Sequence, residues 1–241
     1  DQTAKTTIYY TPYLHDTISL WDGARWVPTT FTEAQGTLAL GTLSSGKPYD
    51  VFAYLSSGVL TLESLAWTND TTRATAVTLQ DGRYCKSGDK TRLYLGSFYT
   101  RSTATTEDSL EYRYVFNAYN QADRMLQKTV ATSHSTGAGA TWRSWNNGTG
   151  DLRVKWFTGL LNNPLVVMLG NWNANGGNAG MGVGAIDSTT PPFATGFFTH
   201  NWLIGFSADV ITAVGPHYVW LCEWGNSVAV QDGSLRGSVK C

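Results

Sequence analysis

The sequence predicts an all-β fold, an antiparallel β-sandwich or jelly-roll-like arrangement, with a pair of small β subdomains as the alternative within that class. Charged residues are scarce, at 15% of 241 residues, while aromatic residues reach 13%. Many of the other polar positions are Thr, Ser, Gly or Asn, and a Thr- and aromatic-rich composition favours pleated, half-buried strands. Turn dipeptides also recur along the chain, and short strands separated by such turns are typical of sandwiches and barrels.

Individual strands follow from the alternation of apolar and polar residues on both sides of these turns. The expected hairpins pair residues 17–21 with 24–27, 50–55 with 59–63, and 76–79 with 83–86. Further strands are expected at residues 93–100, 165–169 and 217–224. We treat residues 1–241 as a single β-rich module, with a subdivision near residue 105 as the alternative.

Two segments need separate treatment. Residues 106–109 have the composition of a helix start. However, Tyr112, Tyr114 and Phe116 are β-formers in nearly strict alternation, so a strand is expected there and a helix is the alternative. Residues 171–184 are rich in Gly and Asn, and we expect them to form a long loop that leads into an edge strand.

Charge and cysteine content exclude several classes of protein. The net charge is −1, so electrostatic attraction gives no reason to expect a nucleic-acid partner. No uninterrupted apolar run is long enough for a transmembrane helix, so we expect no membrane insertion. The three cysteines, Cys85, Cys222 and Cys241, are odd in number, and their spacing does not match a zinc site.

The sequence has no specific catalytic motif. It lacks a His-Glu-x-x-His pair, a Gly-x-Ser-x-Gly elbow and a Walker loop. Glycan hydrolysis needs two carboxylates across a cleft. Asp70 is expected to form an Asx-type turn, and Glu223 to face away from Cys222 and Trp224 on a strand. We therefore expect a protein that is not an enzyme and that uses no metal and no cofactor.

Aromatic residues provide a candidate glycan-binding site. A flat ring beside amide side chains suits a sugar, because the ring stacks on its apolar face while the amides bond its hydroxyls. The alternative for every such residue is a place in the core or in an oligomer interface. The candidate residues are Trp172 with Asn171, Asn173 and Asn175, and Trp142 with Trp145.

Residues 67–76 form the run Trp-Thr-Asn-Asp-Thr-Thr-Arg-Ala-Thr-Ala, which is long enough to be specific. With several shorter stretches, this run resembles a module of bacteriophage structural proteins that are often labelled as tail, fibre or virion proteins. The resemblance spans nearly the whole chain and is weakest at residues 126–181. Further matching stretches lie at residues 49–54, 80–82, 94–98, 106–110, 117–120, 182–184, 187–190 and 218–221. The chain departs from the family at residues 121–124, where Gln-Ala-Asp-Arg stands in place of Arg-Val-Pro-Arg.

This resemblance implies a virion component made in the host cytoplasm: a fibre, spike or decoration protein. It brings no catalytic motif to this chain. Its implied partners are copies of itself and other virion proteins, and a glycan of the host surface is a further candidate. The alternative functions are a carbohydrate-binding module, which could coexist with the virion role, and, as the less favoured one, a glycan depolymerase. A surplus of aromatic residues, ten of them Trp, with few charges also favours a homo-oligomer. A homotrimer follows from the fibre-like resemblance alone, and two-fold or lattice contacts are the alternatives.

Overall fold

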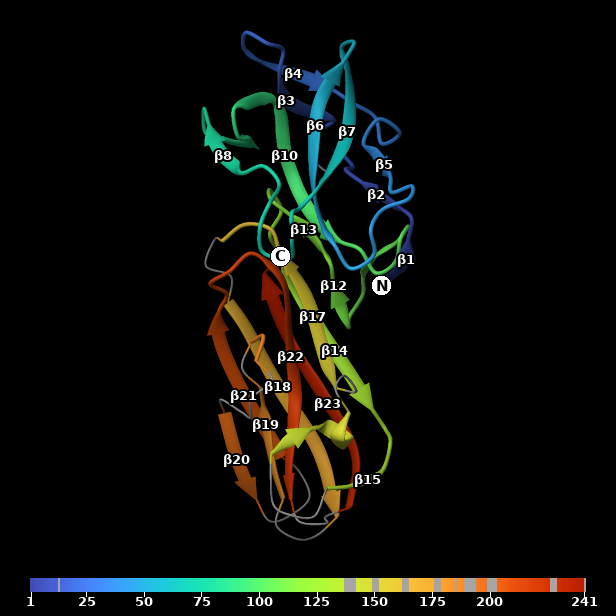
Figure 1. Cartoon of the computed structure of the whole chain (residues 1–241), viewed down its shortest axis with the longest axis vertical. Coiled ribbons are helices and arrows are strands. Elements are labelled where there is room, and N and C mark those ends of the chain that lie inside the picture. Colours follow the sequence, from blue (N-terminus) through green and yellow to red (C-terminus); the bar gives the residue numbers. More distant parts are fainter. Residues whose placement is uncertain are drawn as a thin grey trace.

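The computed structural model describes residues 1–12, 14–136, 142–148, 152–161, 165–175, 179–184, 186–188, 194–198, 203–225 and 229–240. Within these, only the backbone is described for residues 165–175, 179, 181, 194–198, 203–209, 231 and 240. All regular structure in these ranges is β-strand, apart from the 3₁₀ turn η1 (Trp145–Asn147). The predicted all-β class is confirmed, and the molecule is elongated, with the first half of the chain at one end (Figure 1).

One end of the molecule is built around a sheet with the strand order β7-β6-β10-β9-β8, in which β13 also pairs with β10. The strands are β6 (Pro48–Ser56), β7 (Val59–Ala66), β8 (Val77–Gln80), β9 (Arg83–Lys86), β10 (Asp89–Tyr99) and β13 (Val115–Asn117). Two strand pairs accompany this sheet: β2 (Thr7–Tyr9) with β5 (Thr37–Ala39), and β3 (Thr17–Trp21) with β4 (Trp26–Thr30). The predicted hairpins are confirmed as β3-β4, β6-β7 and β8-β9.

The other end contains two further sheets, which in the described part of the chain have eight and five strands (Figure 1). The first has the order β1-β11-β12-β17-β22-β19-β20, with β16 beside β22, and the second has the order β14-β23-β18-β21, with β15 beside β23. Side chains of both sheets enter one hydrophobic cluster, which gives a sandwich-like arrangement. The strands are β1 (Gln2–Lys5), β11 (Thr106–Asp108), β12 (Tyr112–Arg113), β14 (Asp123–Val130), β15 (His134–Ser135), β16 (Arg143–Ser144), β17 (Arg153–Thr158), β18 (Leu165–Asn175), β19 (Ala179–Val183), β20 (Ala194–Phe198), β21 (Leu203–Val210), β22 (Gly215–Gly225) and β23 (Ala229–Lys240).

Buried apolar side chains form two clusters. One cluster contains residues between 18 and 98, and the other contains residues between 114 and 239. Trp67 is the exception, because it follows β7 in the first half and yet packs in the second cluster, edge to face with Phe157. The segment after β7 therefore joins the two halves.

Three local expectations are settled by the backbone. Residues 106–117 form the strands β11, β12 and β13, so the helix alternative is wrong. The loop expected over residues 171–184 is wrong where the chain is described, since β18 extends to Asn175 and β19 occupies residues 179–183. The next strand, β20, does end the strand order of its sheet, as expected of an edge strand. Long-range pairing of β18 with β23 overrides the low strand propensity of its asparagines. The Asx-type turn is made by Asn69, whose Oδ1 accepts from the Thr71 N–H at 3.0 Å, and not by Asp70.

Candidate functional site

Trp142 and Trp145 flank β16, which pairs with β22. Trp145 is fully buried and belongs to the second cluster. Its ring lies against Gly233, where an added Cβ would come within 2.6 Å of Trp145 Cη2. Trp145 therefore takes the core role that the sequence left as the alternative, because no face of its ring is open to a sugar in this structure. Trp142 is half-buried.

Asn171, Trp172, Asn173 and Asn175 lie in β18, and their side chains are outside the described part of the structure. The backbone register places Trp172 opposite Gly233 of β23 and Leu203 of β21. Trp145 packs on that same Gly233, so the Trp145 ring and the backbone of Trp172 adjoin one position of β23. Glycan binding by the β18 residues stays a prediction.

A buried cluster of charged groups lies beside Trp145. Glu223 of β22 has no exposed surface, and its two carboxylate oxygens have different partners. Oε1 accepts from Arg143 Nε at 2.6 Å, and Oε2 lies 2.5 Å from His134 Nε2. Arg143 also donates from Nη2 to the carbonyl oxygen of Ser135 at 2.8 Å.

The geometry of this cluster suits the stabilisation of neighbouring strands rather than the role of a catalytic base. Both oxygens of Glu223 are engaged, and the His134 ring packs edge to face on Trp145 at 4.8 Å between centroids. Glu223 and Cys222 are both buried, which is compatible with the expected opposite orientation of neighbouring strand residues. No sequence pattern indicated this grouping, since Glu223 is 89 positions from His134 and 80 from Arg143.

A second buried cluster involves the run at residues 67–76. Asp50 of β6 is 1% exposed and accepts from Arg73 Nε at 2.9 and 3.2 Å. Ser97 donates from Oγ to Asp50 at 2.7 Å. Burial raises the pKa of Asp50 above its ordinary value, and the charge of the Arg73 guanidinium opposes that rise.

Arg73 connects the two halves of the molecule. Its Nη2 donates to the carbonyl oxygen of Gly159, which follows β17, at 2.6 Å. Its guanidinium carbon also lies 4.4 Å from the centre of the Trp67 ring, a cation–π distance. One side chain of the run therefore holds β6, the segment after β17 and the first residue of the run together.

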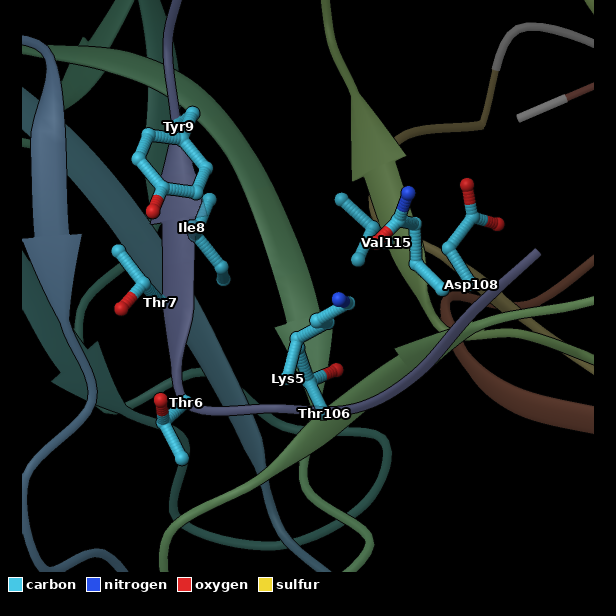
Figure 2. Close-up of a pocket in the computed structure, with 9 residues that line it drawn as sticks. Lys5, Thr6, Thr7, Ile8, Tyr9, Thr106, Asp108 and Val115 are labelled. Atoms are coloured by element: carbon cyan, nitrogen blue, oxygen red, sulfur yellow. The ribbon is translucent and has the colours of Figure 1, made fainter.

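A groove opens between the N-terminal strands and β13 (Figure 2). Its volume is about 450 Å³. Thr7, Ile8 and Tyr9 lie on one side of it, and Val115 and Asp108 on the other. The Asp108 carboxylate is engaged outside the groove, because it accepts from Arg113 Nη1 at 3.2 Å and from Arg124 Nη1 at 2.8 Å. The rest of its described lining combines hydroxyl groups and apolar side chains with Gln2 and Lys5, and Asp108 is the one carboxylate among these residues.

The described residues offer neither a metal-binding group nor a reactive thiol. Among those residues, no group of three or more His, Cys, Asp and Glu side chains could hold a metal ion. The same part of the chain has no helix of the length and apolar character needed to cross a membrane. Burial raises the pKa of Cys85 to about 11 and that of Cys222 to about 12, so both thiols are protonated at neutral pH.

The chain matches no known family and no curated protein. Among solved structures it has weak similarity to β-rich proteins. Dimeric latent PorU from Porphyromonas gingivalis aligns with a TM-score of 0.33 and 8% identity over 83% of this chain and 24% of that one. A chain of infectious bursal disease virus, Gx strain, aligns with a TM-score of 0.32 and 10% identity over 100% of this chain and 72% of that one. The insecticidal δ-endotoxin Cry8Ea1 from Bacillus thuringiensis aligns with a TM-score of 0.27 and 12% identity, and this chain spans about half of its length.

Proposed function

We propose that this protein is a structural component of a bacteriophage virion, a fibre, spike or decoration protein that assembles with copies of itself and with other virion proteins. The observation that carries the proposal is the run at residues 67–76, which resembles phage virion proteins and forms the joint between the two halves. Trp67, Asn69 and Arg73 have separate tasks there: core packing, turn formation and ion pairing. Such a run is characteristic of a scaffold rather than of a reactive site.

The buried charges support a role without catalysis. A catalytic carboxylate needs access to substrate and a free oxygen atom. Asp50 and Glu223 have neither, because each is buried and each is bonded by neighbouring side chains. Assembly into a homotrimer, residence in the virion and contact with a host-surface glycan are parts of the same proposal.

Mass spectrometry of gradient-purified phage particles tests this function. We expect the chain in the particles at a fixed copy number per virion, in a multiple that matches its oligomer. Reducing-end release from host polysaccharide is the matched assay for the rival glycan depolymerase, and we expect none above a buffer control. Absence of the chain from purified particles, or release of reducing ends, would overturn the proposal.

A further inference from the structure

The groove in Figure 2 separates two strands that each have one unpaired edge. In the described part of the chain, β2 pairs with β5 and with no other strand, and β13 pairs with β10 alone. β5 lies on the side of β2 that is remote from the groove (Figure 2). The free edge of each strand therefore borders the same opening.

The alternation of hydrogen-bonded and non-bonded pairs along β13 shows which of its backbone groups point into the groove. The Tyr99 N–H donates to the Tyr114 carbonyl at 2.9 Å, and the Ala118 N–H donates to the Leu95 carbonyl at 3.0 Å. Because bonded and non-bonded pairs alternate in an antiparallel ladder, Val115 and Asn117 occupy non-bonded pairs with β10. Their N–H and C=O groups consequently point away from β10.

The same argument applies to β2. The Leu40 N–H donates to the Thr6 carbonyl at 2.9 Å, and the Tyr10 N–H donates to the Gly36 carbonyl at 2.7 Å. Thr7 and Tyr9 therefore occupy non-bonded pairs with β5 and direct their N–H and C=O groups away from it. An unpaired row of this kind on each side of a groove is a template for an added strand.

A second, smaller hollow adjoins the groove. Its volume is about 60 Å³, and residues of β2, β6, β7, β10 and β13 line it. Ile8, Tyr9 and Val115 line both this cavity and the groove, so the two are continuous. We call the groove between the free edges of β2 and β13 the seam. A strand in this seam would bond both edges and cover the apolar floor.

We propose that the seam accepts strand β1 of a second copy of this chain. An extended backbone is the chemistry that offers donors and acceptors to edges on both of its sides. β1 is suited to leave its own sheet, because its four residues are exposed and its register with β11 is interrupted. Ala4 within it has a φ of 49°, which is unfavourable for a residue with a Cβ.

The donor strand must come from another molecule. Within one chain Thr6 alone separates β1 from β2, whereas a hairpin needs at least about two connecting residues. β1 already lies at the mouth of the seam, since Gln2 and Lys5 line the groove. The small side chain of Ala4 is compatible with the size of the cavity. This inference rests on the proposed function as an assembling protein and names the surface and the segment that would join the copies.

The first test compares variants by size-exclusion chromatography with light scattering. A chain lacking residues 1–5 has no donor strand, and Tyr9→Pro has no groove-facing N–H on β2. Pro is tolerated at such a position because that N–H is not part of the β5 ladder. We expect both variants to lose the mass of the parent oligomer and to run as monomers. Tyr9→Ala, the matched control, loses the exposed ring but keeps the N–H, and we expect it to retain the parent mass.

Mixing the two defective variants tests whether the β1 strand of one can fill the seam of the other. The truncated chain still has both edges of the seam, and Tyr9→Pro still has its β1. We expect a one-to-one dimer from the mixture and none from either variant alone. Hydrogen exchange of the parent adds a readout without mutation: the amides of Tyr9, Val115 and Asn117 should be protected in the oligomer and should exchange rapidly after dilution to monomer.

The outcomes separate the two proposals. A parent that is oligomeric and variants that stay oligomeric would overturn strand exchange and leave the proposed function intact. A parent that is monomeric at every concentration would overturn both strand exchange and self-assembly. Unprotected seam amides in the oligomer would also overturn strand exchange, even if the truncated chain failed to fold.

Discussion

Replacing Arg73 should lower the free energy of unfolding, because it leaves the buried carboxylate of Asp50 without its positive partner. In an Arg73→Met variant, Asp50 keeps the Ser97 hydroxyl as a donor but loses the guanidinium that bonds it at 2.9 Å. The side chains of this pair are 12% and 1% exposed, so solvent does not replace the lost partner. Breaking a buried pair on one side costs about 3–5 kcal/mol. We expect the free energy of unfolding at neutral pH to fall by that amount.

The size of this loss should depend on pH. Burial raises the pKa of Asp50 in the folded protein, and the Arg73 charge lowers it, so the variant raises that pKa further. A group whose folded pKa lies above its unfolded pKa contributes stability at low pH that is lost as pH rises through the folded pKa. The variant should therefore be closer in stability to the parent at a pH well below the ordinary Asp pKa of about 3.9, where a carboxyl with a raised pKa is protonated, than at neutral pH.

Urea denaturation of parent and variant at both pH values measures these differences. The matched control is Lys90→Met, which breaks the exposed pair between Lys90 and Asp81, in which the side chains are 34% and 47% exposed. Surface pairs of this kind contribute about 0–1 kcal/mol. A loss for Arg73→Met no larger than that of the control, or a loss that does not change with pH, would refute the reasoning.

Further predictions concern the second buried cluster, the cysteines and the tryptophan of β18. Glu223→Gln leaves two basic side chains without their anion, and we expect urea denaturation to show a loss of about 3–5 kcal/mol. In a Cys241→Ser background, Cys85 and Cys222 should not react with a thiol reagent until the protein is unfolded, because burial raises their pKa; rapid reaction of the native protein would contradict this. Trp172→Ala should abolish binding on a glycan array or to host cells if its ring stacks on a sugar, and unchanged binding by a folded variant would remove the glycan role.

Sequence patterns predicted the hairpins well because their determinants are local. Asp81 and Gly82 have φ values of 51° and 78°, and Ser57 and Gly58 have φ values of 51° and 80°. Consecutive positive φ values are the geometry of the tight turns that join hairpin strands, and Asp-Gly and Ser-Gly favour them. The turn and the alternation beside it lie within ten or so residues of sequence, and they were therefore visible without a structure.

The extension of β18 through Asn171–Asn175 could not be predicted in this way. The Asn- and Gly-rich composition favours a loop, and the determinant of the strand is a ladder to β23, in which Asn175 pairs with Ala229. The Glu223 cluster was missed for the same reason, since its members come from β15, β16 and β22. Such long-range contacts leave no mark on the sequence immediately around either residue, so a local pattern cannot predict them.

Two buried carboxylates, Asp50 and Glu223, share one structural use. Asp50 ties a regular strand to the irregular segment after β7 through Arg73, and Glu223 ties β22 to the short strands β15 and β16. Asp187 makes similar connections from an exposed position outside the strands, because it bonds the buried His217 of β22 at 2.6 Å and accepts from the Tyr218 N–H at 2.9 Å.

In each case a carboxylate holds a segment that makes few strand-to-strand hydrogen bonds of its own. A chain with 15% charged residues thereby commits several of them to its interior. The exposed surface is left with fewer charges to repel a neighbouring copy, as the proposed self-assembly requires. Replacing a buried anchor should loosen its segment, and hydrogen exchange after Glu223→Gln should rise first in β15 and β16 and not in the hairpin β6-β7.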